Sequence, residues 1–297
     1  MTTSISALFN RTVVTLSLAT SIIFSPVQAD EVKTLVFSAI PDQDESRLKA
    51  RFNKVADYLS ESLNIPVKYV PVKSYAASVT SFRNNQFQLA WFGGFSGVQA
   101  RLLTPGAQAI AQGEEDPNFL SYIIAHKSTG LERNDEFPKE IAGKRFTFGS
   151  KGSTSGRLMP EYHIRKNMEK LPAELFSSVG FSGNHSRTVA LVESGAYEVG
   201  AVNYKVWNRM VKEKKVDTDK VSIIWTTPPY PDYQWTIRGD VDATWGTGFS
   251  AKVKQALLDM KDPELLASFP RKSFISASNE DFITIEETAR SIGLIDK

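Results

Sequence analysis

The residue types best suited to chemistry lie in one short segment, Gly152-Ser153-Thr154-Ser155-Gly156-Arg157, between a predicted strand and a predicted helix. A helix start offers unpaired backbone N–H groups and a partial positive charge. Three hydroxyl groups flanked by glycines add further donors, a pattern typical of a site for a carboxylate or a tetrahedral oxyanion. The alternative is a simple Ser/Thr helix cap, for which one hydroxyl would be enough.

Nucleophilic catalysis has weaker support. A P-loop needs a second glycine where Thr154 stands, and the lipase motif G-x-S-x-G needs a serine at the same position. Ser153, His185 and Asp232 are the residue types of a catalytic triad, but residue type is their only support. The sequence therefore favours binding over catalysis, with a periplasmic hydrolase that uses Ser153 or Ser155 as the alternative from another class.

Composition excludes several other classes of function. The chain has 297 residues, 41% hydrophobic and 23% charged, with 35 basic and 33 acidic residues for a net charge of +2. No basic excess or stripe points to nucleic acid. There is no cysteine, and the three histidines are far apart in sequence, which argues against zinc and iron–sulfur sites. We expect no metal, no cofactor and no nucleic-acid partner.

The first 29 residues have the pattern of a signal peptide. Arg11 precedes a short apolar run over 13–24, and Val27-Gln28-Ala29 supplies a cleavage site. The run is too short to span a bilayer stably. We expect secretion to the periplasm without a lipid anchor, because no cysteine is available to carry one.

The rest of the chain alternates predicted strands and helices, which predicts an α/β fold with mostly parallel sheets. The predicted strands are 33–40, 67–70, 87–92, 120–125, 145–148, 199–202, 221–225 and 234–238. The strands at 120–125 and 234–238 bracket one complete α/β unit. We therefore expect a discontinuous first lobe, 30–125 plus 234–297, a second lobe, 126–233, and a ligand cleft between them at two hinge crossings.

Three segments carry a resemblance to a known family. Tyr75-Ala76-Ala77-Ser78-Val79, Ala90-Trp91-Phe92-Gly93-Gly94, and Ser153–Gly156 with Pro160 resemble the periplasmic binding proteins of phosphonate and phosphite ABC transporters. The segments 39–42 and 90–101 look closer still to a sub-branch labelled as selenate transporter binding proteins. The likeness runs over essentially the whole mature chain. It implies a type II Venus-flytrap fold, a monomer, and delivery of the ligand to a membrane permease with a cytoplasmic ATPase.

The resemblance also implies roles for individual residues. Tyr75 matches a tyrosine that contacts the ligand oxyanion, and Ser153 and Thr154 match the hydroxyls at the helix start, with Ser155 beside them. His185 matches a histidine of the second lobe that reaches the same group. Asp232 matches a carboxylate that faces the ligand amine in amino-phosphonate binders. From the residues alone, His185 is equally well explained as an exposed residue of a capping region.

Two positions depart from the family pattern. Phe92, just before Gly93 in the binding motif, replaces a tyrosine and removes one hydroxyl donor. Lys205 stands where amino-phosphonate binders place a glutamate, and an ammonium there would repel an aminoalkyl group. We therefore expect a small oxyanion such as phosphonate or phosphite, with selenate and sulfate as further candidates and 2-aminoethylphosphonate disfavoured. A periplasmic sensor module for the same anions is the alternative within binding.

Overall fold

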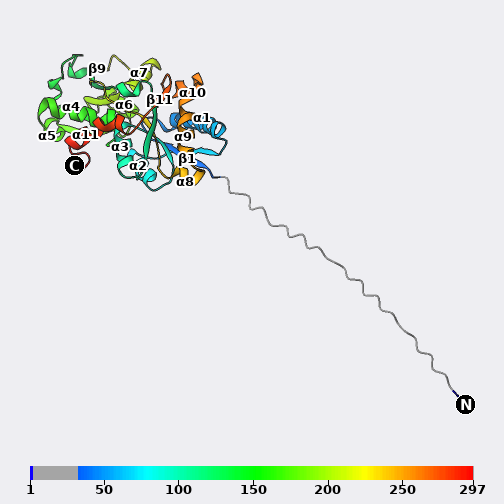
Figure 1. The fold of residues 1–297 in the computed structure, drawn as a ribbon. Helices are drawn as coiled ribbons and strands as arrows, with labels where there is room; N and C mark the ends of the chain where they lie inside the picture. Colours follow the sequence, from blue (N-terminus) through cyan, green and yellow to red (C-terminus); the bar gives the residue numbers. More distant parts are fainter. Residues whose placement is uncertain (3–32, 297) are drawn as a thin grey trace. The chain divides into compact units, whose positions relative to one another are not determined.

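The computed structural model describes residues 1–2 and 33–296, and residues 33–296 lie within one compact unit of the chain (Figure 1). The expected signal peptide, residues 1–29, lies outside the described residues apart from its first two positions. Among the described residues, no helix has both the length and the apolar character needed to cross a membrane. The description below concerns residues 33–296.

The first sheet has six strands in the order β11-β4-β10-β3-β1-β2. Strands β2, β1 and β3 are parallel, and β10 is inserted antiparallel between β3 and β4. The bounds of these strands are β1 Leu35–Ala39, β2 Val67–Tyr69, β3 Leu89–Phe92, β4 Gln108–Gly113, β10 Gln234–Ile237 and β11 Phe274–Ser276. The helices of this lobe, which we call lobe 1, are α1 Glu45–Leu63, α2 Tyr75–Arg83, α3 Gly94–Leu102, α8 Val241–Trp245, α9 Phe249–Leu258, α10 Pro263–Ser268 and α11 Ile283–Ser291, with short turns η1 Asp116–Asn118 and η5 Glu280–Phe282.

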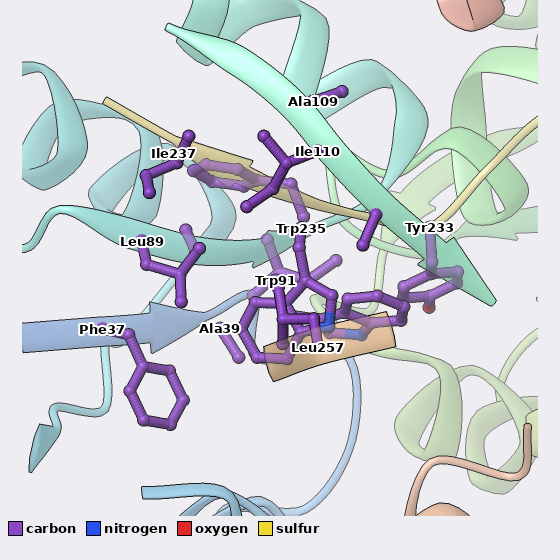
Figure 2. Packing of buried hydrophobic residues seen from close by; sticks show 14 of the residues in the cluster. Phe37, Ala39, Leu89, Trp91, Ala109, Ile110, Tyr233, Trp235, Ile237 and Leu257 are labelled. Atoms are coloured by element: carbon purple, nitrogen blue, oxygen red, sulfur yellow. The ribbon is translucent and has the colours of Figure 1, made fainter. Parts of the chain in front are cut away.

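Aromatic side chains fill the core of lobe 1 (Figure 2). The Trp235 ring on β10 is fully buried and lies 5.8 Å from the Phe37 ring on β1 and 5.3 Å from the Trp91 ring on β3, centroid to centroid. Because helices cover the sheet, its inner strands β1 and β3 are apolar along most of their length instead of alternating. This packing fixes the ends of β1, β3 and β10, where the site residues of lobe 1 begin.

The second sheet has five strands in the order β7-β6-β8-β5-β9, with β5 antiparallel to both neighbours. Separate apolar clusters pack on its two faces. The strands are β5 Ser121–His126, β6 Arg145–Phe148, β7 Ser178–Phe181, β8 Val199–Asn203 and β9 Val221–Thr226. The helices of this lobe 2 are α4 Met159–Met168, α5 Pro172–Leu175, α6 His185–Glu193 and α7 Tyr204–Lys212, with turns η2 Lys127–Thr129, η3 Lys139–Ile141 and η4 Thr154–Leu158.

The two-lobed α/β fold is confirmed, but two expectations need a correction. The sheets are mixed and not mostly parallel, because β10 lies antiparallel between β3 and β4 in the first sheet, β11 is antiparallel to β4, and β5 lies antiparallel between β8 and β9 in the second. The expected boundary at residue 125 is also wrong. Strand β5 pairs with β8 and β9 of the second sheet, so the chain crosses before Ser121. The apolar run at 120–125 predicts a strand correctly but carries no information on which sheet that strand joins. Strands β4, β7 and β11 were not predicted: small and polar residues dominate the QAIAQG sequence of β4, and β7 and β11 are only four and three residues long.

Candidate functional site: a buried cluster between the lobes

Four helix starts converge where the two lobes meet. Tyr75 begins α2 and Gly94 begins α3 in lobe 1, while Thr154 begins the η4 turn that leads into α4, and His185 begins α6, in lobe 2. The side chains of Tyr75, Thr154 and His185 are each at most 2% exposed. Helix starts carry free N–H groups and partial positive charge, so their convergence creates a place for an anion without any full charge.

The predicted hydroxyl segment forms a wide helical turn in which the N–H of Leu158 donates to the Ser153 carbonyl over five residues, at 3.0 Å. Such turns are frequent at functional sites. The Ser153 Oγ accepts a bond from the Gly156 N–H at 2.9 Å. Across the cleft, Thr154 Oγ1 accepts one from the Phe95 N–H of lobe 1 at 3.0 Å. Since both oxygens accept from N–H groups, their hydroxyl protons point into the cluster, that of Ser153 toward Tyr75 and that of Thr154 toward Asp232.

Close backbone approach explains two glycines here. A Cβ on Gly93 would lie 3.1 Å from Asp232 Oδ1 and 3.2 Å from Thr154 Oγ1. A Cβ on Gly152 would lie 3.1 Å from Cβ of Tyr75. Both positions are therefore lined by site residues from the opposite lobe or from the hinge, and a larger side chain would push the lobes apart.

Asp232 lies at the second crossing and joins this cluster. Its Oδ1 accepts a bond from the Gly94 N–H at 2.8 Å, and among the described residues its buried Oδ2 has no hydrogen-bond partner. Burial raises the pKa of Asp232 to about 7, although the Thr154 hydroxyl and the Gly94 N–H favour its charged form. A proton is therefore available at this carboxyl near neutral pH. Ser155, 1% exposed, follows Thr154 and also interacts with Asp232.

The His185 ring is held in one neutral form. The Asn203 N–H donates to its Nδ1 at 3.3 Å. Burial lowers the pKa of His185 to about 4, with Asp42 opposing and Arg209 adding to the effect. A neutral ring that accepts at Nδ1 carries its proton at Nε2. That Nε2 is buried and has no partner among the described residues, which makes it a free donor.

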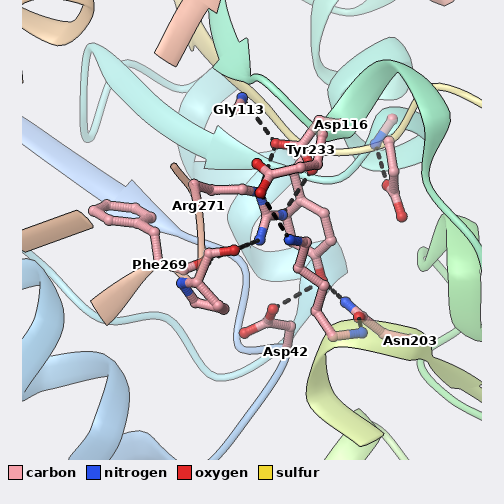
Figure 3. Close-up of polar contacts among 12 residues, drawn as sticks. Asp42, Gly113, Asp116, Asn203, Tyr233, Phe269 and Arg271 are labelled. Atoms are coloured by element: carbon pink, nitrogen blue, oxygen red, sulfur yellow. Dashed lines mark hydrogen bonds and ion pairs between the residues drawn. The ribbon is translucent and has the colours of Figure 1, made fainter. Parts of the chain in front are cut away.

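A hydrogen-bonded chain links the lobes beside this ring (Figure 3). The Asn203 side-chain amide donates to the Tyr233 hydroxyl at 2.9 Å, and that hydroxyl donates to Asp42 Oδ2 at 2.8 Å. The backbone oxygen of Asp42 in turn accepts a bond from the His185 N–H at 3.0 Å. Lobe 1, the hinge and lobe 2 therefore each contribute one member of the chain.

A buried ion pair holds the hinge side of the cluster in place, as Figure 3 also shows. Arg271 donates through two nitrogens to the Asp116 carboxylate, at 2.8 and 2.7 Å, and its guanidinium lies 5.3 Å from the centre of the Tyr233 ring. The Asp116 backbone oxygen accepts a bond from the Asp232 N–H at 3.0 Å. The two crossing segments are thus fixed to one another and to lobe 1.

The structure brings together Tyr75, Gly93, Ser153, Thr154, Ser155, His185 and Asp232. It places two other predicted site residues elsewhere. The Phe92 ring packs edge-on against Phe82 at 5.5 Å in the core of lobe 1. The Lys205 Nζ lies 3.3 Å from Glu115 and forms an ion pair across the lobes.

The arrangement of His185 differs from a catalytic triad. A triad base donates its Nδ1–H to a carboxylate, whereas His185 Nδ1 accepts from a backbone N–H. The Asp232 carboxyl, moreover, accepts from Gly94. The cluster therefore offers donors to an anion and lacks the orientation of an activated nucleophile.

The sequence analysis did not assign Asp42, Asn203 or Tyr233 to the site. All three lie at or near strand ends, and Tyr233 comes directly before β10. Asp42 comes after β1 and Asn203 ends β8, the carboxyl ends of strands at which ligands of open α/β sheets bind. That position is the signal that could have found them. His163 is 8% exposed and packs against Trp225, because α4 turns it toward the sheet.

The buried neutral ring of His185 predicts acid sensitivity. Its pKa falls from 6.5 to about 4 on folding, so its contribution to stability is complete above pH 6.5 and is lost as the pH falls toward 4. Because acid must protonate a fully buried ring, the free energy of unfolding should fall by up to about 3 kcal/mol over that range. Urea unfolding of His185→Gln should show a smaller stability difference between neutral and acid pH than the wild type. His126→Gln, which removes a partly exposed ring of lobe 2, is the matched control; if both variants keep the wild-type dependence, the assignment to His185 is wrong.

Two α/β lobes, joined at two crossings and enclosing converging helix starts, define a substrate-binding protein of the bilobal periplasmic type. The family model described as "ABC transporter, phosphonate, periplasmic substrate-binding protein" matches residues 37–282. The chain belongs to this family, whose members are the substrate-binding components of ABC importers. The narrower resemblance to selenate transporter proteins stays a prediction.

Comparison with known proteins supports the same assignment. A Prochlorococcus marinus protein named as an ABC transporter phosphite binding protein, PhnD1, is 40% identical over 94% of this chain and 96% of its own length. The solved structure of PhnD1 in complex with methylphosphonate matches with a TM-score of 0.84, covering 89% of this chain and all of that one. The binding component of an ABC phosphonate transporter from Pseudomonas aeruginosa, 18% identical, shares the fold with a TM-score of 0.77 over 87% of this chain and 86% of that one.

Proposed function

We propose that this chain captures a phosphonate- or phosphite-like oxyanion between its two lobes and delivers it to a membrane permease driven by a cytoplasmic ATPase. The observation that carries the proposal is the free Nε2 of His185 beside the hydroxyl of Ser153. A Cβ on Gly156 would lie 3.1 Å from Cε1 of that ring and 3.0 Å from Ser153 Oγ. A buried hydrogen-bond donor without a partner destabilises the folded protein unless a ligand accepts its hydrogen bond.

The proposed ligand-contacting residues are all buried in the cluster. Each offers a hydrogen-bond donor, an acceptor or a close approach of its backbone. They are Tyr75, Gly93, Ser153, Thr154, Ser155, His185 and Asp232. The methylphosphonate bound by PhnD1, a relative at 40% identity, supports this ligand class for the present chain. The neutral donors and helix starts suit a small anion, and the arrangement of His185 and Asp232 supports a role without catalysis.

The proposal also covers the export of the protein and its oligomeric state. Residues 1–29 act as a signal peptide that sends the chain to the periplasm, and the mature protein works there as a monomer. The family assignment and the pattern of residues 11–29 support this route.

Calorimetric titration of ligand-stripped protein tests the proposed ligand class. The panel is phosphite, methylphosphonate, 2-aminoethylphosphonate, phosphate, sulfate and selenate. We expect dissociation constants on the order of micromolar or lower for phosphite or methylphosphonate, about −8 kcal/mol or better. Silence across the panel would contradict the ligand class and leave only the family assignment standing.

A further inference from the structure

Polar side chains away from the ligand cluster join the two lobes along one side of the cleft. Arg47, in the first turn of α1 of lobe 1, places Nη2 2.7 Å from Glu213 Oε2 at the end of α7 of lobe 2. Both side chains are about one third exposed, at 32% and 29%. The Glu213 carboxylate also faces Lys215 at 2.9 Å and Arg209 at 3.6 Å, so three cations surround it.

The contact continues inward to the ligand cluster. Arg209, one turn before Glu213 on α7, donates to Gln43 Oε1 of lobe 1. The Gln43 amide lies 3.5 Å from Asp42 Oδ2, the same oxygen that accepts from Tyr233. Asp42 in turn accepts from the His185 N–H through its backbone oxygen. The polar path therefore runs from the surface to the ring that offers its proton to the ligand.

These contacts depend on the two lobes being together. Arg47 and Gln43 belong to lobe 1, while Arg209 and Glu213 belong to lobe 2, so separation of the lobes breaks both links. A contact made in the closed form and absent from the open form shifts the equilibrium toward closure. Such a contact raises ligand affinity without touching the ligand, because affinity scales with the fraction of competent protein.

We propose that Arg47, Glu213, Arg209 and Gln43 form an interlobe clasp, a set of positioning residues that favours closure and holds Asp42 and His185 in place for the oxyanion. The role in affinity rests on the proposed function, since it needs an oxyanion ligand. The role of the clasp in closure is independent of the proposed function, because the contacts join the lobes without a ligand.

A double-mutant cycle with methylphosphonate as the probe tests the clasp. Arg47→Gln and Glu213→Gln should each weaken binding about two- to fivefold, the size expected of a partly exposed ion pair, and the double variant should be no weaker than either single one. Arg47→Lys should recover part of the loss. The matched control is the Arg145–Glu198 pair, 3.5 Å apart and contained within lobe 2, whose Gln variants should bind as the wild type does. Fully additive losses, or equal losses in the control, would overturn the proposal.

A ligand-independent measurement separates the clasp from the proposed function. Because the chain has no cysteine, Glu61→Cys in lobe 1 and Lys170→Cys in lobe 2 allow one spin label in each lobe. In unliganded protein, Arg47→Gln and Glu213→Gln should shift the label-to-label distances to longer values, and Arg145→Gln should not. Unchanged distances together with unchanged affinity would refute the clasp. Wild-type protein that binds no member of the anion panel refutes the proposed function instead, and the distance comparison then decides on the clasp alone.

Discussion

Ser153→Ala combined with Thr154→Val is expected to weaken methylphosphonate binding by about 3–6 kcal/mol, a loss of at least a hundredfold. A buried hydroxyl that donates to a charged group is worth about 1.5–3 kcal/mol, and the variant removes two of them. Thr154 Oγ1 also accepts from the Phe95 N–H of lobe 1, so Val at this position leaves that donor unpaired in the closed form as well. Titration calorimetry of the variant against methylphosphonate measures the loss directly.

The control separates loss of the site from loss of the fold. Ser194→Ala with Thr218→Val removes the same atoms from two exposed positions of lobe 2. This control should bind as the wild type does, and thermal unfolding should show both variants folded at the titration temperature. A folded Ser153/Thr154 variant with near wild-type affinity would remove the η4 turn from the ligand site.

The position of the hydroxyl turn could be predicted from sequence because all of its signals are local. Glycines, three hydroxyls and a following helix pattern lie within one segment, Gly152–Gly156, and the structure places that segment at the helix start where the pattern predicts it. Tyr75 is similar, since Ser74 caps α2 and accepts from the Ala77 N–H. Local signals of this kind do not depend on which elements become neighbours.

Residues joined through tertiary contacts could not be predicted in this way. Asp42, Asn203 and Tyr233 come from three distant segments, and their hydrogen-bonded chain exists because β1, β8 and the second crossing end at one place. The surroundings of Lys205 also depend on a tertiary contact. Its Nζ lies 3.3 Å from Glu115 of lobe 1 and forms an ion pair there, a contact between segments far apart in sequence.

The ligand anion and the Asp232 carboxyl must share one proton, and this predicts how affinity depends on pH. The Asp232 side chain is buried, 1% exposed, and its Oδ2 has no partner among the described residues. Two negative groups in contact there would repel strongly, whereas one proton between them makes a hydrogen bond. That proton comes from Asp232, whose pKa is about 7, or from the phosphonate monoanion.

We therefore expect methylphosphonate affinity to fall about tenfold per pH unit once the pH rises above the pKa values of both groups, because the complex then takes up one proton. Asp232→Asn should remove this fall, since its amide donates to the dianion and needs no proton. Titrations between about pH 7.5 and 9.5 compare the two proteins, and Asp240→Asn, a change at an exposed carboxylate paired with Arg238, is the control that should keep the wild-type slope. A wild-type affinity that is flat across this range would mean that the bound anion lies away from Asp232 Oδ2. The preference of the site would then be set by the hydroxyl turn and His185 without help from the carboxyl.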